Sequence, residues 1–89
     1  MCRNIKPLFH FEPPATEEEI RQAALQFVRK VSGMQAPSKA NQAAFQAAVD
    51  AIAGVTSTLF GELQTPTPPK NRAEEDAKAR ARSARRFAS

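Results

Sequence analysis

Few residues in this 89-residue chain are able to perform covalent chemistry, and they lie near its start. Cys2 is the only cysteine and His10 the only histidine. If Met1 were removed, the amine and thiol of an N-terminal Cys2 could together act as a nucleophile, and Arg3 would favour the thiolate. A catalytic site also needs a residue that orients the base, and none is evident. We therefore expect an inert thiol and no enzyme, with catalysis by Cys2 as the most distant alternative.

Metal and phosphate-loop chemistry are not predicted either. A metal site needs three or four ligands at suitable spacing, and one cysteine, one histidine and scattered carboxylates do not supply them. There is no glycine-rich phosphate loop. Asp50 and Glu62 lie among apolar neighbours, where a carboxylate more often marks the edge of a buried face than a catalytic acid. We expect no cofactor and no metal.

The charge pattern is the strongest functional signal in the sequence. Residues 1–64 contain six basic and six acidic side chains, whereas residues 65–89 contain seven basic and three acidic ones, so the whole net charge of +4 lies in the second range. Such a cluster could neutralise nucleic-acid phosphates, although most charge runs are solvated faces. The candidate phosphate-binding residues are Lys78, Arg80, Arg82, Arg85 and Arg86.

Two elements precede this cluster in the first half of the chain. Prolines exclude a helix from residues 1–14, which we expect to form an extended arm anchored by Ile5, Leu8, Phe9 and Phe11. Residues 16–19, with the sequence TEEE, form a capping box that begins a helix. Gly33 supplies its left-handed stop.

A long second helix and a short third one follow. Ser38 is the expected N-cap of the second helix, which should run to about Leu63. A proline-rich linker comes next. Asn71 could then cap a third helix that begins at Arg72 and ends near Phe87, with acids in its first turn and arginines in its last turns, as the helix dipole favours.

The second helix carries a stripe of small residues beside its stripe of large ones. Glycine weakens a helix by about 1 kcal/mol relative to alanine, so two glycines on one face suggest close approach by another helix. The alanine face of the third helix could dock there, in the same chain or in a neighbouring one. The predicted helix–helix interface comprises Ala40, Ala44, Ala47, Ala51, Gly54, Thr58 and Gly61.

The predicted fold is all-α, because no segment has the alternating period of a strand. Residues 1–64 form a helical hairpin with the N-terminal arm, residues 65–71 a linker, and residues 72–89 the basic helix, within one domain or swapped onto a partner. The core of so short a chain is small. We therefore expect a partner chain that covers further apolar surface.

The composition also predicts where the protein is found. A single cysteine fits a reducing compartment. Arg3 and Lys6 are followed by Pro7, and no apolar run long enough for export comes after it. Gln46 and Asp50 interrupt the most apolar stretch, so we expect no membrane span. These features predict a cytoplasmic protein.

Five motifs are spread along the whole chain: residues 1–6 (MCRNIK), 11–20 (FEPPATEEEI), 28–33 (VRKVSG), 37–41 (PSKAN) and 77–82 (AKARAR). Together they resemble a small bacterial family, domain-of-unknown-function family 2277. The resemblance implies a bacterial, cytosolic protein. It implies no chemistry, because the family has no assigned activity.

The residues and the resemblance lead to one functional hypothesis and one main alternative. We expect a non-enzymatic helical interaction module that associates with itself. The alternative is a nucleic-acid-binding accessory protein that works through its basic C-terminal helix.

Overall fold

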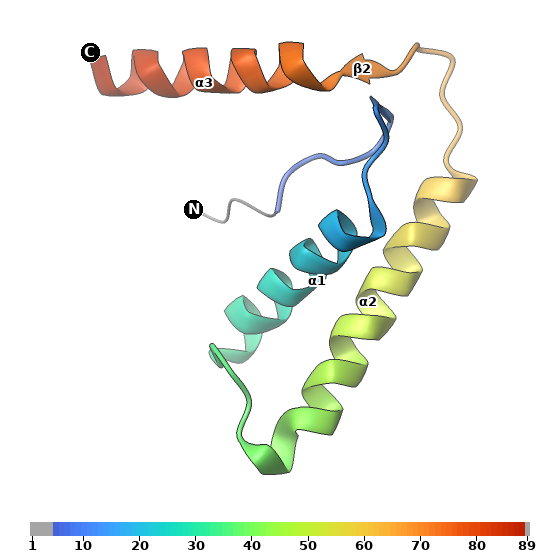
Figure 1. The fold of residues 1–89 in the computed structure, drawn as a ribbon, viewed down its shortest axis with the longest axis vertical. Helices are drawn as coiled ribbons and strands as arrows, with labels where there is room; N and C mark the ends of the chain where they lie inside the picture. The colour runs from blue at the N-terminus through green and yellow to red at the C-terminus, as the bar shows by residue number, and fades with distance from the viewer. Residues whose placement is uncertain (1–4, 89) are drawn as a thin grey trace.

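The computed structural model describes residues 5–88, except for the side chains of residues 85–88, and it confirms a mainly α-helical fold with three helices (Figure 1). The helices α1 and α2 form an antiparallel hairpin, and α3 extends away from its open end. In chain order the elements are β1 (Phe11–Glu12), α1 (Glu17–Ser32), the 3₁₀ helix η1 (Lys39–Asn41), α2 (Gln42–Glu62), β2 (Lys70–Asn71) and α3 (Arg72–Ala88).

Helix α1 begins and ends where the sequence predicts. The hydroxyl of Thr16 accepts a hydrogen bond from the amide of Glu19 at 3.1 Å, and the carboxylate of Glu19 accepts one from the amide of Thr16 at 3.0 Å. This is the predicted capping box. Gly33 adopts a left-handed conformation with φ of 73° and donates its amide to the carbonyl of Arg29. A residue with a Cβ would be strained in that conformation.

The second helix begins differently from the prediction. The segment opens with the 3₁₀ turn η1, and the α-helical part starts only at Gln42. Ser38 precedes the turn, but its hydroxyl accepts from the side-chain amide of Asn41 at 2.9 Å and caps no backbone amide. Ser38 therefore stands at the predicted N-cap position of the helical segment, but its hydroxyl makes no capping bond.

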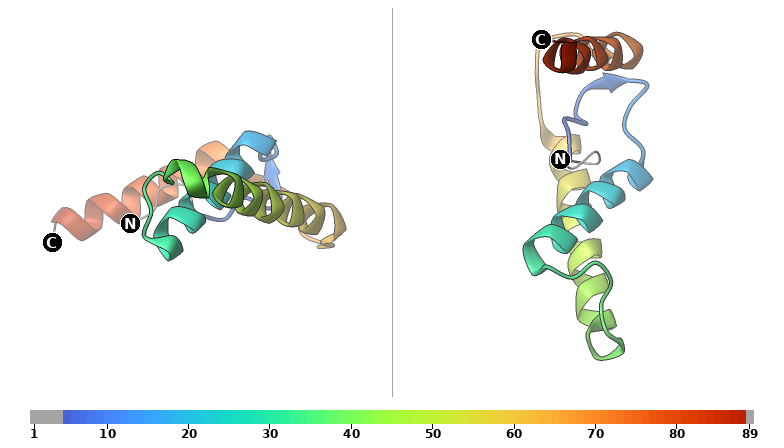
Figure 2. Two further views of the ribbon diagram at one scale, coloured as in Figure 1. Left: turned by 90° about the horizontal axis from the view of Figure 1, so that it is seen from below. Right: turned by 90° about the vertical axis from the view of Figure 1, so that its left-hand side faces the viewer.

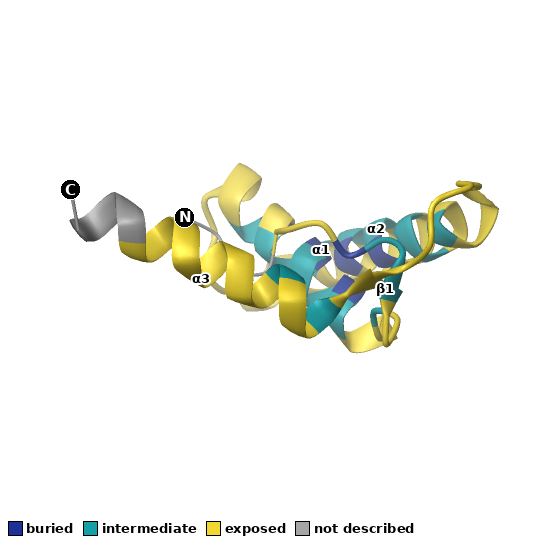
Figure 3. Ribbon diagram, turned by 90° about the horizontal axis from the view of Figure 1, so that it is seen from above, coloured by how far each residue is buried: buried dark blue, intermediate teal, exposed yellow. Residues whose placement is uncertain are grey.

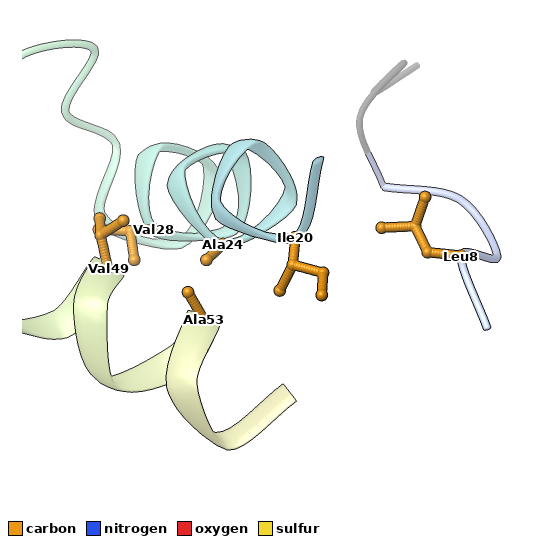
Figure 4. Packing of buried hydrophobic residues seen from close by; sticks show 6 residues of the cluster. All are labelled: Leu8, Ile20, Ala24, Val28, Val49 and Ala53. Atoms are coloured by element: carbon orange, nitrogen blue, oxygen red, sulfur yellow. The ribbon is translucent and has the colours of Figure 1, made fainter. Parts of the chain in front are cut away.

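The core lies between α1 and α2 and is small, as Figure 4 shows. Ala24 and Val28 of α1 face Val49 and Ala53 of α2, and Val49 is the most deeply buried of them at 2% exposure. Leu8 of the arm is buried beyond the end of this contact. The complete set of buried residues is Leu8, Ile20, Ala24, Val28, Val49 and Ala53.

The N-terminal arm is anchored by three of its four predicted residues. Leu8 is buried and Phe11 is half-buried. Phe9 packs against Phe60 of α2, with ring centroids 5.6 Å apart. Ile5 is 49% exposed, so its predicted anchoring role is wrong.

A short strand pair joins the arm to the start of α3. Phe11 of β1 pairs with Lys70 of β2 and Glu12 with Asn71, in parallel. We call these four residues the strand clip. The sequence predicts no strand, because a two-residue pair has no measurable alternation and its partners are far apart in the chain. The clip adds one two-residue pair to a fold that is otherwise all-α, as predicted.

Among the described residues, the side-chain hydrogen bond and salt bridge that hold α3 to the hairpin are at its first turn. The side chain of Asn71 accepts from the amide of Glu74 at 2.9 Å, which confirms the predicted cap. Arg72 forms a 2.7 Å salt bridge with Glu19 at the start of α1. Beyond this turn α3 projects past the hairpin (Figure 2), and its described side chains are mostly exposed (Figure 3).

Candidate functional site

The side chains of α2 are apolar or small around most of its circumference. Between residues 42 and 62 the only charged residues are Asp50 and Glu62. A helix of this kind normally lies inside a bundle, covered on several sides. Here α1 is the helix that packs against α2, and α3 lies elsewhere (Figure 1). Much of α2 therefore faces solvent within a single chain.

Large apolar side chains are exposed on both helices of the hairpin. Val55 is 71% exposed, Leu59 48% and Phe27 47%. Since each residue turns a helix by about 100°, and the helices are antiparallel, these three side chains fall on the same side of the hairpin plane. Ala48 and Ala51 lie on that side too. We call Phe27, Ala48, Ala51, Val55 and Leu59 the apolar face.

The opposite side of the hairpin is polar and internally paired. Arg21 of α1 forms a 2.5 Å salt bridge with Asp50 of α2, and Gln46 donates to the same carboxylate at 3.2 Å. The bond from Arg21, followed by that from Gln46, lowers the pKa of Asp50. Such groups are compatible with water, so the hairpin has one polar and one apolar side.

The chain exposes more surface than a compact protein of its size. Its accessible surface is 6863 Å², whereas a folded monomer of 9.7 kDa is expected to expose about 5,100 Å². The radius of gyration is 15.8 Å, against about 12 Å for a compact chain of this length. The surplus of about 1,700 Å² exceeds the roughly 800 Å² that each partner buries in a standard interface.

The predicted small-residue interface lies along η1 and α2 in the described structure. All seven of its members are exposed. A Cβ added at Gly54 or Gly61 would meet no atom within 4 Å, so nothing in the described chain approaches these glycines closely. Within this chain α3 does not lie on the stripe (Figure 1). Contact with a neighbouring chain remains a prediction.

The predicted phosphate-binding residues are carried by α3. Lys78, Arg80 and Arg82 are exposed. Lys78 lies 3.6 Å from the carboxylate of Glu75, so part of its charge is compensated locally. Arg85 and Arg86 belong to α3, but their side chains lie outside the described residues. The structure therefore places three of the five cations on one exposed helix.

Of the candidate nucleophile Cys2 and the only possible imidazole base, His10, the structure describes His10 alone. Cys2 lies outside the described residues. The Nε2 atom of His10 is 2.6 Å from the carbonyl oxygen of Thr67. A carbonyl oxygen only accepts, so Nε2 carries the proton in this contact and holds the linker to the arm. Among the described residues, no three His, Cys, Asp or Glu side chains form a group that could hold a metal ion.

A cavity that the sequence does not predict lies between the arm and α3. Its volume is about 260 Å³. The α3 residues that line it are spaced at intervals of three and four, which places them on one side of the helix. That spacing is visible in the sequence, but the arm that closes the cavity is not. The lining cations are Lys6, Lys70, Arg72 and Arg82.

One segment of the described chain satisfies the length and composition of a membrane span. Residues Lys39–Glu62 form a continuous helix that is long and apolar enough, and 11% of its most apolar window is buried within the chain. The same properties are found in core helices of bundles. The prediction that the protein does not enter a membrane is therefore left to experiment.

Comparison with known proteins gives one match. The family model described as "Uncharacterized conserved protein (DUF2277)" matches residues 1–78. No curated protein and no solved structure matches the chain.

Proposed function

The chain belongs to the DUF2277 family, whose description assigns no activity, and we propose from its own residues that it is a non-enzymatic module that dimerises through the apolar face of its hairpin. The observation that carries the proposal is the exposure of Phe27, Val55 and Leu59 on one side of a hairpin whose other side is polar.

The size of the core supports association. Only six described residues are buried, and two of them are alanines. Burying a large apolar side chain contributes about 1.5–3 kcal/mol, while ordering each residue costs about 1–2 kcal/mol of conformational entropy. A partner that covers Val55, Leu59 and Phe27 would add burial with little further ordering, because these side chains already lie on formed helices.

A second copy of the chain is the occupant that the surface fits best. Two-fold interfaces bring the same patch of each protomer together, and a charged patch would then repel itself. The five residues of the apolar face are uncharged, and by helical spacing the exposed charges on that side lie at its margins, Lys30 one turn beyond Phe27 and Glu62 one turn beyond Leu59. Two hairpins packed in this way would form a four-helix bundle, in which α2 receives the coverage that its composition requires.

The experiment measures molar mass by size-exclusion chromatography with light scattering across a concentration series. We expect twice the 9.7 kDa of one chain. Val55→Glu should give the monomer mass, because two carboxylates would be buried without partners. Val55 is largely exposed within a single chain, so this substitution leaves the monomer fold intact, as circular dichroism can verify.

Ala43→Glu is the matched control. Ala43 is exposed, lies in the first turn of α2 and falls on the other side of the hairpin, where a carboxylate suits the helix dipole. This variant should keep the dimer mass. A wild-type monomer at every concentration would refute the proposal, and co-flotation of that monomer with lipid vesicles would identify a bilayer as the occupant instead.

A second candidate function, nucleic-acid binding, is favoured by the placement of α3. The helix projects from the hairpin with Arg80 and Arg82 exposed, as backbone contacts to phosphates require. Glu75 partly compensates the positive charge of Lys78, which weighs against nucleic-acid binding. We therefore rank this function second.

A further inference from the structure

The cavity between the N-terminal arm and α3 has an apolar lining. Pro7, Leu8 and Phe11 of the arm and β1 face Ala79 of α3 across it. Ala79 is small, so it leaves room where a larger residue would fill the space. Leu8 is buried beneath the cavity and Phe11 is half-buried. The lining therefore offers a bound molecule an apolar contact and one aromatic ring.

Cations from three different segments surround this lining. They are Lys6 of the arm, Lys70 of β2 and Arg82 of α3. None of the three forms a salt bridge with any described residue. The Nζ atom of Lys70 lies 5.9 Å from the centre of the Phe11 ring, which holds the ammonium at the edge of the cavity.

The remaining charges of the cavity are largely compensated. Arg72 is paired with Glu19 outside the cavity, and Glu75 lies against Lys78. Asp76 also lines the cavity and opposes part of its positive charge. Lys6, Lys70 and Arg82 carry three positive charges, and Asp76 carries one negative charge. The cavity therefore has a net positive charge, which suits a small anion.

We propose that this cavity is a binding site for a small phosphate monoester that carries an aromatic group. The phosphate would lie among Lys6, Lys70 and Arg82, and the aromatic group would lie on Phe11 and Ala79. The cations that line one cavity attract a doubly charged phosphate more strongly than a singly charged carboxylate. The volume of about 260 Å³ is at the lower end of ligand cavities, so the ligand must be small.

This inference does not rest on the proposed dimerisation. The residues of the cavity belong to the arm, β1, β2 and α3, whereas the apolar face belongs to α1 and α2. Loss of one function would therefore leave the other measurable.

The test is calorimetric titration of the full-length protein with phenyl phosphate at low ionic strength. Inorganic phosphate, benzyl alcohol and benzoate are titrated in parallel. We expect phenyl phosphate to bind at least several-fold more tightly than each of the other three, because it alone uses both the cations and the apolar lining. Equal affinity for inorganic phosphate or for benzoate would overturn the assignment.

Arg82→Ala and Arg80→Ala form a matched pair of variants. Both remove one exposed arginine from α3, but only Arg82 lines the cavity. Arg82→Ala should weaken phenyl phosphate binding about three- to tenfold, whereas Arg80→Ala should change it less than twofold. Equal losses in the two variants would indicate a diffuse charge effect and refute the site.

Lys70→Ala provides an independent check from another segment. The backbone amide of Lys70 makes the bond to the carbonyl of His10, so removing the side chain leaves the strand clip intact. Binding should weaken as in Arg82→Ala, with an unchanged melting temperature. Undiminished binding in Lys70→Ala would contradict the proposed location of the phosphate.

Discussion

At the scale of single residues, Glu19 has two roles. Its carboxylate closes the capping box of α1 by accepting from the amide of Thr16, and it also accepts from Arg72 at the start of α3. The hydrogen bond from Arg72 is the main cause that lowers the pKa of Glu19, followed by the bond from the Thr16 amide. One side chain therefore ties the N-cap of α1 to the start of α3.

The lowered pKa predicts how stability depends on pH. Because the pKa of Glu19 is lower in the folded chain than its ordinary value of 4.5, the stabilisation is complete well above pH 4.5. It is lost as the pH falls through the lowered, folded-state value. Glu19→Gln should retain the capping box, since glutamine also serves at that position, but should lose the charged pair with Arg72.

We expect Glu19→Gln to reduce the free energy of unfolding at pH 7 by about 0.5–1 kcal/mol. The difference from wild type should disappear in acid. Thermal melts at several pH values measure both effects. Glu18→Gln is the control, because the side-chain hydrogen bond of Glu18 is to Gln22 and not to Arg72. A difference between Glu19→Gln and wild type that persists in acid would show that the ion pair is not its source.

At the scale of elements, α2 is the part of the chain whose composition and surroundings disagree most. The helix is apolar or small on most sides, yet its coverage within one chain comes from α1 and from contacts of the arm near Phe60. The small-residue stripe is exposed to solvent, and α3 does not pack against it. The composition of α2 is thus best explained by a neighbour that a single chain does not contain.

Substitution of Gly54 separates two effects, one on the stability of α2 and one on its association with a neighbouring chain. Gly54→Leu meets no atom in the described chain, and it should strengthen α2 by somewhat under 1 kcal/mol through helix propensity. Gly54 lies on the other side of α2 from the apolar face, so the leucine should disrupt the dimer only if a second copy also packs against the stripe. Light scattering and thermal melting measure the two effects separately.

Gly54→Ala is the matched control for that substitution. Alanine removes the same helix-weakening glycine but keeps the surface small, so this variant should melt higher and stay dimeric. An unchanged mass and a raised melting temperature in Gly54→Leu would show that the stripe is not part of an interface.

At the scale of the whole molecule, the chain is an extended body with two separable parts. The hairpin contains the described core, while α3 is held by the strand clip and by the Arg72–Glu19 salt bridge. The positive charge of the protein is concentrated in the part that projects. Any partner attracted by charge should therefore bind through α3, and any partner attracted by apolar surface through the hairpin.

Removal of residues 66–89 tests that separation. The shortened chain should lose any affinity for short labelled DNA or RNA, measured by fluorescence anisotropy at two salt concentrations. Binding by the full chain should weaken steeply with salt. A full-length Lys78→Ala, Arg80→Ala variant controls for damage to the fold by truncation. Affinity retained by the shortened chain would rule out α3 as the nucleic-acid contact.

The sequence by itself determined the features that depend on neighbours along the chain. The capping box at Thr16, the left-handed Gly33 and the Asn71 cap are confirmed because each involves residues within four positions of one another. The helical period of α1 predicts a face of five residues: Ile20, Ala24, Phe27, Val28 and Val31. Ile20, Ala24 and Val28 are buried as predicted, whereas Phe27 and Val31 are exposed because α2 covers only part of that face. The family could also be identified from local motifs.

Only the tertiary structure decided what the distant segments do. The pairing of Phe11 with Lys70 and the salt bridge between Arg72 and Glu19 join segments more than fifty residues apart. Arg21 pairs across the hairpin with Asp50, although Glu17 is its expected partner along α1. Helical spacing shows which residues share a side of one helix, but not which segment that side meets. For this reason the apolar face and the cavity beside α3 emerge only when the segments are placed in space.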